Sequence, residues 1–230
     1  MNNILIMSGE FEGLIYAVQE LGFNVIQSES IDVLPPFERN HADMQTLKIG
    51  DTVFILKDCE RLSAEIKKLG YNVIKTESKI KGKYPGNVLL NAVYLNGKLY
   101  GRLDSLDKSL IAYCKNHSID MINVKQGYTK CSTATIEGGF ITSDRGIFDA
   151  MLRNGEEGLL IECGDIELKG VDYGFIGGCC FEYDNTVYMT GVLNNHKNKA
   201  DIENYIKYKN KKIQYLSTDS IYDIGGFVVL

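Results

Sequence analysis

Short apolar runs alternate along this chain with tight turns and amphipathic stretches, always in the same order. Two strand-like runs joined by a tight turn are followed by a helix-like stretch and a third strand-like run. The turns recur every 41 to 47 residues, at Gly50-Asp51, Asn96-Gly97, Glu137-Gly138-Gly139 and Asp184-Asn185. Asn-Gly is typical of a hairpin turn because both residues readily adopt positive φ. The pattern therefore predicts a repeated strand–strand–helix–strand unit.

The first complete unit illustrates the helical part of the repeat. Glu60–Leu69 places Leu62, Ile66 and Leu69 on one face of a helix, and Gly70 is typical of a helix end. The other helix-like stretches are Ser105–Asn116, Gly146–Arg153 and Asp201–Lys209. The first strands of the four units are predicted at Met44–Ile49, Val88–Leu95, Ser132–Ile136 and Cys179–Tyr183.

The two ends of the chain supply a fifth unit that is split between them. Phe227–Leu230 has the character of a first hairpin strand and Ile4–Met7 that of its partner, with a helix predicted over Glu12–Leu21. Repeats of this length indicate a propeller or solenoid, and the split unit favours a closed ring, because closure leaves no free sheet edge. An α+β protein with chance periodicity is the alternative.

We therefore predict one α/β (α+β) domain over residues 1–230. Its architecture is a five-bladed pseudo-symmetric ββαβ propeller, closed by pairing of the N- and C-terminal strands. The units are residues 224–230 with 1–34, then 41–80, 86–126, 130–170 and 176–220.

Composition and charge narrow the classes of protein. The 230 residues, 44% of them hydrophobic and 24% charged, are typical of a globular chain with its own core. A net charge of −5 without a long basic run argues against a nucleic-acid partner, and no apolar stretch is long enough to span a membrane. The N-terminus lacks the features of a signal peptide, so we expect a cytoplasmic protein with six reduced cysteines. The sequence indicates no cofactor and defines no oligomeric partner.

In a closed ring the first strands begin together at one mouth of the central channel. His41 and Asp43 would share a face of a strand, because they are two residues apart. Cys131 lies as far before its turn as Asp43 does before its own, so the three side chains are predicted to converge. A thiolate nucleophile, an imidazole acid or base and an orienting carboxylate suit covalent catalysis. At a wet mouth, we expect His41 to lower the pKa of the Cys131 thiol.

Several residues near this mouth are candidate substrate contacts. They are Glu38 and Arg39, which lead into His41; Asn87, at the start of another first strand; Asp144 and Arg145, after the third hairpin; and Gly177 and Gly178, which allow a close backbone approach. Asp144 can instead cap the following helix.

Alternatives to the catalytic interpretation stay open at this point. His41 and Asp43 can form a surface pair, and Cys131 can be a small buried residue. Cys179 or Cys180 can replace it as the nucleophile, because they lie near the same mouth. A zinc site built from His41, Asp43 and Cys131 has no supporting spacing, so no metal is predicted.

The predicted ring resembles the guanidino-group modifying enzyme superfamily, which includes arginine deiminases, amidinotransferases, dimethylarginine hydrolases and agmatine deiminases. More narrowly, the chain resembles a bacterial, largely clostridial branch of that fold whose reaction is not established. The blocks that carry this resemblance are His41–Met44, Gly127–Thr133, Ile141–Ile147 and Gly174–Gly178.

The resemblance implies a chemistry for these residues. In the characterised enzymes a cysteine attacks the guanidinium carbon, a His-x-Asp supplies acid–base help, and further carboxylates hold the guanidinium nitrogens. His41 and Asp43 match the His-x-Asp, and Cys131 is the thiol that best fits the nucleophile. The enzymes place their cysteine in the last unit, whereas Cys131 is in mid-chain, and their Glu-Gly-Gly-Asp is absent here.

The sequence thus predicts a cysteine-dependent enzyme acting on a small cationic guanidine, amidine or related C–N substrate, as a hydrolase or an amidinotransferase. The same ring also occurs in translation factors that are not enzymes. A catalytically silent binding protein is therefore the alternative, since fold alone does not fix function.

Overall fold

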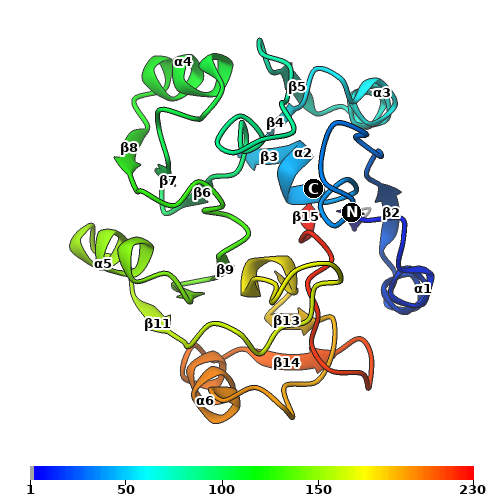
Figure 1. Cartoon of the computed structure of the whole chain (residues 1–230), viewed down its shortest axis with the longest axis vertical. Helices are drawn as coiled ribbons and strands as arrows, with labels where there is room; N and C mark the ends of the chain where they lie inside the picture. The colour runs from blue at the N-terminus through cyan, green and yellow to red at the C-terminus, as the bar shows by residue number, and fades with distance from the viewer. Residues whose placement is uncertain (1–2) are drawn as a thin grey trace.

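The computed structural model describes residues 3–230, which form five three-stranded sheets arranged in a ring (Figure 1). In ring order the strands are β15 (Val228–Val229), β1 (Ile4–Met7) and β2 (Asn24–Gln27); β3 (Thr46–Ile49), β4 (Thr52–Ile55) and β5 (Asn72–Lys75); β6 (Val93–Leu95), β7 (Lys98–Gly101) and β8 (Asp120–Asn123); β9 (Thr133–Ile136), β10 (Gly139–Thr142) and β11 (Gly158–Leu160); and β12 (Cys180–Tyr183), β13 (Thr186–Met189) and β14 (Lys212–Tyr215).

Each sheet carries one helix between its second and third strands. These helices are α1 (Glu12–Glu20), α3 (Glu60–Lys68), α4 (Lys108–Asn116), α5 (Arg145–Arg153) and α6 (Lys199–Tyr208). The first two strands of every sheet are antiparallel and the last two are parallel. This topology follows from the sequence, because a tight turn joins antiparallel strands and a helical crossover joins parallel ones.

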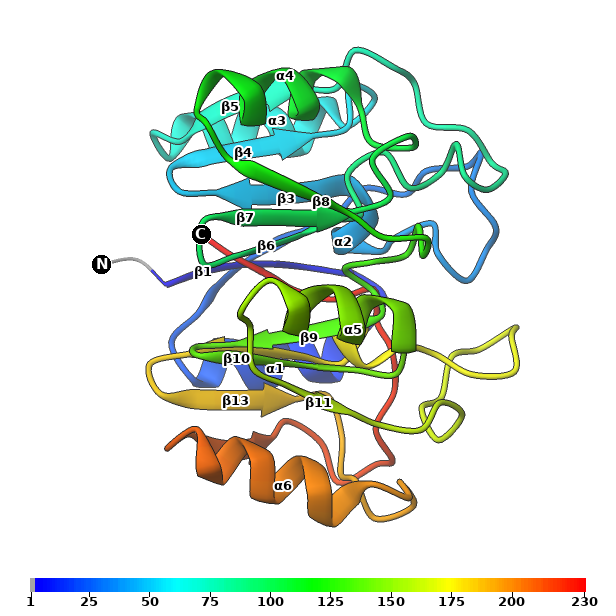
Figure 2. The ribbon, with the colours of Figure 1, turned by 90° about the vertical axis from the view of Figure 1, so that its left-hand side faces the viewer.

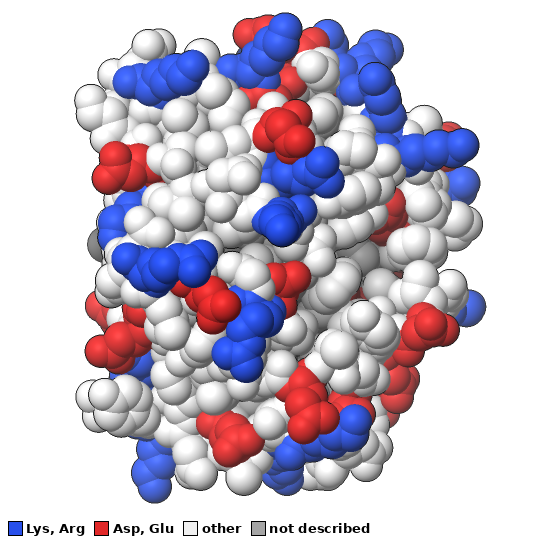
Figure 3. Space-filling model, turned by 60° about the vertical axis from the view of Figure 1, so that its left-hand side comes forward, with Lys and Arg blue, Asp and Glu red and all other residues white. Residues whose placement is uncertain are grey.

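The strands run along the ring axis, so the ring has two different ends (Figure 2). Long connections lie at the end where the first strands begin, which we call the loop end. The tight turns lie at the opposite end, which we call the hairpin end. No helix within residues 3–230 has both the length and the apolar character that a membrane crossing requires. On the face shown in Figure 3, basic side chains are interspersed with acidic ones.

Pairing of the two terminal strands closes the ring, as predicted. β15 is antiparallel to β1, with Leu5 opposite Val229 and Ile6 opposite Val228. The strand–strand–helix–strand repeat is likewise confirmed in all five sheets. The helix predictions were accurate within about three residues, with one error of detail. Leu69 ends α3 and is 42% exposed, whereas Leu62 and Ile66 are fully buried.

The first strands begin later in the chain than predicted. Residues that were expected to open β3 form the short helix α2 (Ala42–Gln45), and β6 begins only at Val93. A 3₁₀ helix, η1 (Ile176–Gly178), likewise precedes β12. At α2 the chain is tied to the neighbouring sheet instead, since the Asp43 N–H donates to the Gly225 carbonyl at 2.9 Å. His41 and Asp43 therefore do not share a face of a strand.

Candidate active site

A cavity of about 320 Å³ opens at the loop end of the ring. Its wall combines a thiol, an imidazole and carboxylates with aromatic and aliphatic side chains. The lining residues are Phe37, Glu38, His41, Tyr128, Cys131, Leu168, Val171, Asp172, Tyr173, Phe175 and Asp223. Three separate loops and the segment before β15 supply them, so the ring topology assembles the cavity from distant parts of the chain.

His41 and Asp43 are held in place by two glycines that precede β15. His41 caps the start of α2, and Asp43 lies in its first turn. A Cβ on Gly225 would lie 2.1 Å from His41 Cγ, and a Cβ on Gly226 would lie 3.1 Å from Asp43 Oδ2. Both glycines have positive φ, which other residues rarely adopt. The Gly225-Gly226 pair thus lets the chain pass directly against the two candidate residues.

Asp43 is fully buried, and neither of its carboxyl oxygens has a hydrogen-bond partner among residues 3–230. The pKa of this carboxyl is raised to about 7, mainly by burial and also by the Asp223 charge, against the lowering effects of His41, Lys130 and the Cys131 side chain. Asp43 therefore changes its protonation state near neutral pH, as a general acid or base must. It was predicted at a wet mouth, and its complete burial corrects that expectation. His41 is also buried, at 8% exposure.

Cys131 lies in the turn before β9 and is 3% exposed. Asn91 holds it from two sides: Asn91 Nδ2 donates to Cys131 Sγ at 3.0 Å, and Asn91 Oδ1 accepts from the Cys131 N–H at 3.3 Å. Sequence reasoning missed Asn91. The available signal was position, since Asn91 and Cys131 each lie two residues before the first strand of neighbouring units.

The surroundings of Cys131 favour the neutral thiol over the thiolate. Burial raises its pKa well above the usual value, and the charges of Asp43 and Asp223 raise it further, while the Asn91 hydrogen bond lowers it. The expectation of a lowered pKa for this thiol was therefore wrong. Burial is the main cause, because a thiolate loses its hydration in the low-dielectric interior, and the two carboxylates add to the effect.

Asp223 is a second residue that sequence reasoning missed. Its carboxylate accepts from the Phe175 N–H at 2.9 Å and from the Gly225 N–H at 2.8 Å, and it is 3% exposed. It thereby joins the wall of the cavity to the glycine pair that packs against His41. Its place two residues before Gly225, at the mouth, was the signal that could have found it.

Glu38 and Asn87 were predicted as substrate contacts, and the structure brings them together beside the cavity. Asn87 Nδ2 donates to Glu38 Oε1 at 3.0 Å and to the Tyr128 hydroxyl at 2.6 Å. Burial raises the pKa of Glu38, against the lowering effects of Asn87 and His41. Glu38 and Tyr128 line the cavity, whereas Asn87 supports them from behind.

Aromatic rings form the outer wall of the cavity. Tyr128 and Phe175 are stacked with centroids 6.2 Å apart, and Tyr173 meets Phe175 edge to face at 6.2 Å. Aromatic faces attract cations, and the carboxylates that line the cavity add negative charge, which also attracts a cation. Within the described residues the cavity wall contains no lysine or arginine. This lining suits a cationic planar ligand.

Three predicted substrate contacts lie elsewhere. Asp144 caps α5 by accepting from the Ile147 N–H at 2.8 Å, as the alternative interpretation held. Arg145 is exposed on the same helix and pairs with Asp149 at 3.9 Å. Arg39 Nε donates to the Leu34 carbonyl at 3.0 Å and does not line the cavity. These predictions failed because each side chain satisfies a local partner instead.

Gly177 and Gly178 have a packing role, rather than touching the cavity. A Cβ on Gly177 would lie 2.1 Å from the Lys130 carbonyl oxygen, and one on Gly178 would lie 1.8 Å from Asp223 Oδ1. The Gly177 N–H also donates to the Cys131 carbonyl at 2.8 Å. The close backbone approach predicted for these glycines is therefore made to the candidate site residues themselves.

The rival cysteines are placed differently from Cys131. The Cys179 thiol donates to the Phe175 carbonyl at 3.0 Å, and the Cys180 thiol to the Ile176 carbonyl at 3.6 Å. Neither lines the cavity at the loop end. Within residues 3–230, no group of three His, Cys, Asp or Glu side chains is arranged to hold a metal ion.

Solved structures of other proteins have a similar fold. DDAH from Pseudomonas aeruginosa, solved as a mutant complexed with citrulline, matches with a TM-score of 0.61 at 10% identity over 100% of both chains. The N-terminal domain of ArgZ, an arginine dihydrolase from cyanobacteria, matches with a TM-score of 0.56 at 11% identity over 94% of this chain and 90% of that one. SxtG, an amidinotransferase from Microseira wollei, matches with a TM-score of 0.58 at 10% identity, over 95% and 78%.

These three proteins share the fold of the guanidino-group modifying enzymes, and the present chain has that fold. A search of curated protein sequences found no match. Residues 6–228, nearly the whole chain, match a family described as "Family of unknown function (DUF6873)". The chain therefore belongs to the DUF6873 family and carries the five-bladed fold of the guanidino-group modifying enzymes.

Proposed function

We propose that this protein is a cytoplasmic enzyme that uses Cys131 to attack the planar carbon of a guanidine, an amidine or a related C–N substrate. The observation that carries the proposal is convergence: Cys131 and His41 line one cavity with the carboxylates of Glu38 and Asp223, and Asp43 lies beside them. Neighbours of the same fold support it, since they include a hydrolase and an amidinotransferase.

Binding of a cationic substrate would activate the thiol. Burial raises the pKa of Cys131 most, and the charges of Asp43 and Asp223 raise it further; a guanidinium or amidinium beside these carboxylates would offset their charge. Charge-assisted hydrogen bonds to Glu38 and Asp223 would fix the planar group against the sulfur. Cys131 would thus become a nucleophile only after the substrate binds, and the buried neutral thiol would be unreactive until then.

The proposed reaction has two steps, formation of a covalent Cys131 intermediate and its breakdown. The thiol proton passes to the Asp43 carboxylate while Cys131 Sγ forms a bond to the substrate carbon, and the tetrahedral intermediate then expels an amine that takes a proton from the His41 imidazolium. In a hydrolase, water attacks the same carbon and gives its proton to His41; the C–S bond then breaks, and Asp43 returns its proton to the sulfur to restore the thiol. In an amidinotransferase, an acceptor amine replaces the water.

Alkylation by 2-chloroacetamidine tests the proposal, because this reagent carries the planar cation. In a Cys163→Ser background, which removes the exposed cysteine, intact-mass spectrometry should show one adduct. It should map to Cys131 and be lost in Cys131→Ala. The neutral analogue 2-chloroacetamide should react far more slowly, since it lacks the charge that the carboxylates bind. Equal rates for the two reagents would show that the site does not recognise the cation.

One observation favours the alternative of a silent binding protein. The Cys131 thiol is 3% exposed, and Cys131 lies in mid-chain rather than in the last unit, where the characterised enzymes carry their cysteine. Under this alternative, neither reagent labels Cys131 in the folded protein, while a cationic ligand still protects the protein against thermal unfolding. Labelling of Cys179 or Cys180 instead would assign the nucleophile to another unit.

A further inference from the structure

A second cavity, of about 620 Å³, occupies the hairpin end of the ring. The first strands of all five sheets contribute to its wall, because these strands surround the axis: β3, β6, β9, β12 and β15. It shares no lining residue with the cavity beside Cys131. The two cavities are therefore separate spaces at opposite ends of the ring, and the proposed reaction uses only the first.

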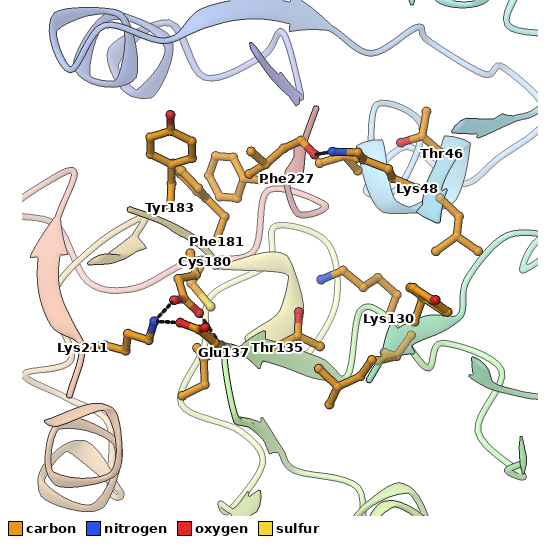
Figure 4. Close-up of a pocket in the computed structure, with 18 of the residues that line it drawn as sticks. Thr46, Lys48, Lys130, Thr135, Glu137, Cys180, Phe181, Tyr183, Lys211 and Phe227 are labelled. Atoms are coloured by element: carbon orange, nitrogen blue, oxygen red, sulfur yellow. Dashed lines mark hydrogen bonds and ion pairs between the residues drawn. The ribbon is translucent and has the colours of Figure 1, made fainter. Parts of the chain in front are cut away.

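Three lysines of this second cavity differ in how their charges are satisfied (Figure 4). Lys211 is paired with both Glu137 and Glu182. Lys48 Nζ donates to the Val229 carbonyl at 3.2 Å, and no carboxylate among residues 3–230 lies within ion-pair distance of it.

Lys130 is the least satisfied of the three. Its side chain extends from the turn before β9 toward the middle of the cavity, and in the described residues its ammonium group makes neither a hydrogen bond nor an ion pair (Figure 4). Lys130 and Lys48 thus offer two ammonium groups to one cavity, and each retains N–H donors without partners among the described residues. The carboxylates of Asp43 and Asp51 act on Lys130 and Lys48, respectively, without forming an ion pair. Burial lowers the pKa of Lys48, which is the direction that an unpaired buried cation shows.

One part of the wall is apolar. Phe227 and Phe181 pack with ring centroids 4.7 Å apart, and Cys180, Val228 and Ala92 extend the same surface. The space exceeds what an inorganic ion would fill, so an organic body must accompany the anionic group. Two lysines without an arginine or a cluster of backbone N–H groups suit the two oxygens of a carboxylate.

From this arrangement we propose that the hairpin end binds a small organic monocarboxylate. Its two oxygens accept from Lys130 and Lys48, and its compact apolar body lies against Phe227 and Phe181. The site is distinct from the Cys131 cavity in position. Its affinity for an anion would come from Lys130 and Lys48, because Glu137 and Glu182 neutralise only Lys211. The proposal does not depend on the proposed function.

The test uses the full-length protein, labelled with ¹⁵N, and 4-methylpentanoate as the probe. Titration should shift the backbone amide resonances of the first strands near the hairpin end, including those of β9, β12 and β15. The neutral 4-methylpentan-1-ol and the cationic 4-methylpentylamine have the same apolar body, so neither should produce these shifts at the same concentrations. Inorganic phosphate tests the charge without the body and should bind more weakly.

Two substitutions locate the anionic group. Lys130→Met and Lys48→Met should each weaken 4-methylpentanoate binding by about tenfold or more, the usual effect of one charge-assisted hydrogen bond. Lys115→Met removes an exposed lysine of α4 and should leave binding unchanged. The wild-type titration needs no variant, so a variant that fails to fold leaves the proposal testable.

Any of four results would overturn the proposal. Equal binding of the alcohol and the carboxylate would make the cavity merely apolar. Equal weakening by Lys115→Met and Lys130→Met would make the effect one of general electrostatics. The other two are wild-type amides at the hairpin end that do not shift with tens of millimolar carboxylate, and a stronger response of these amides to phosphate.

Discussion

Asn91 and Cys131 are joined through both ends of the asparagine amide: Asn91 Nδ2 donates to Cys131 Sγ at 3.0 Å, and Asn91 Oδ1 accepts from the Cys131 N–H at 3.3 Å. The same oxygen also accepts from the Lys130 N–H at 2.8 Å. Because Asn91 is fully buried, water cannot replace these bonds when they are lost. One side chain therefore fixes the turn that carries both the candidate nucleophile and the unpaired lysine.

Replacing Asn91 should destabilise the protein and disturb the thiol. Asn91→Leu leaves two buried N–H groups without an acceptor, at a cost of about 1–3 kcal/mol for each. Urea denaturation measures that loss. Asn195→Ala is the matched control, because this exposed asparagine bonds only Ser220 and its loss should fall within about 0.5 kcal/mol. Equal stability of the two variants would show that the Asn91 contacts contribute little.

Asn91→Asp separates the two ends of the amide. The substitution keeps the acceptor for the backbone N–H groups but removes the donor to the sulfur and adds a negative charge. Since the Asn91 hydrogen bond lowers the pKa of the thiol, its loss should raise that pKa further. Alkylation of Cys131 by 2-chloroacetamidine should then need a higher pH than in the wild type. An unchanged pH profile would contradict this role for Asn91.

Gly225→Ala should unfold the protein or weaken it severely. The new Cβ would lie 2.1 Å from His41 Cγ, so the substitution combines a steric clash with a positive φ of 81°. Gly22→Ala is a control with nearly the same φ, 87°, and no heavy atom within 4 Å of the new Cβ. Thermal unfolding of the two variants separates backbone strain, which both share, from contact with His41. Similar losses in both would rule out the clash as the cause.

The sequence predicted the ring but not the structure at the mouth of its channel. The ring follows from contacts within each unit, whereas the mouth depends on contacts between distant parts of the chain. Hairpin turns such as Asn96-Gly97 and helical periodicity such as Leu62 with Ile66 act within one unit, so a single sequence displays them. The Asp43 N–H donates instead to the Gly225 carbonyl, which lies at the other end of the chain. No local pattern records that contact.

The candidate site shows the same limit. Cys131 and His41 were predicted by residue type and position, and they line one cavity. The pKa of the thiol was predicted in the wrong direction, because it depends on burial and on Asp223, a residue placed beside it only by ring closure. Asp144 and Arg145 were placed at the mouth from their order in the chain, whereas helix capping accounts for Asp144.

Asp43 should make stability fall as pH rises. Its pKa is about 7 in the folded protein and near 3.8 in the unfolded chain, so its contribution is complete below about pH 4 and is lost as pH rises to about 7. Asp43→Asn does not titrate. The variant should therefore gain stability relative to the wild type across this range, by on the order of 4 kcal/mol.

Urea denaturation of the wild type and of Asp43→Asn at several pH values measures this difference. Asp104→Asn is a control of opposite sign, because the Arg102 guanidinium lowers the pKa of that exposed carboxyl. Its removal should slightly reduce stability above pH 4. A stability difference between Asp43→Asn and the wild type that stays constant with pH would show that Asp43 does not titrate near neutrality. Because both His41 and Asp43 are buried, loss of stability alone cannot separate a catalytic from a structural role.

Deletion of Gly226–Leu230 should prevent folding. It removes β15, leaves an edge of β1 unpaired and takes Phe227 and Val228 from the core, at about 1.5–3 kcal/mol for each large side chain. Such a loss approaches the whole stability of an ordinary domain. The truncated chain should aggregate in size-exclusion chromatography. Deletion of half-buried Leu230 alone should preserve a cooperative melt, and a soluble, cooperatively melting truncation at Gly226 would contradict closure by β15.

A circular permutant tests whether the split unit is equivalent to the other four. β15 and β1 are antiparallel neighbours, and the Leu230 N–H donates to the Ile4 carbonyl at 3.0 Å, so a short turn between Leu230 and Ile4 would make the same hairpin that the other sheets already have. New termini can open in the turn at Asp184-Asn185, since an exposed hairpin tip tolerates a break. The permutant should fold and melt cooperatively near the wild-type temperature. A permutant that opens β10 between Phe140 and Ile141, both buried, should not fold. If the two permutants behave alike, the five units are not the interchangeable blades that the ring implies.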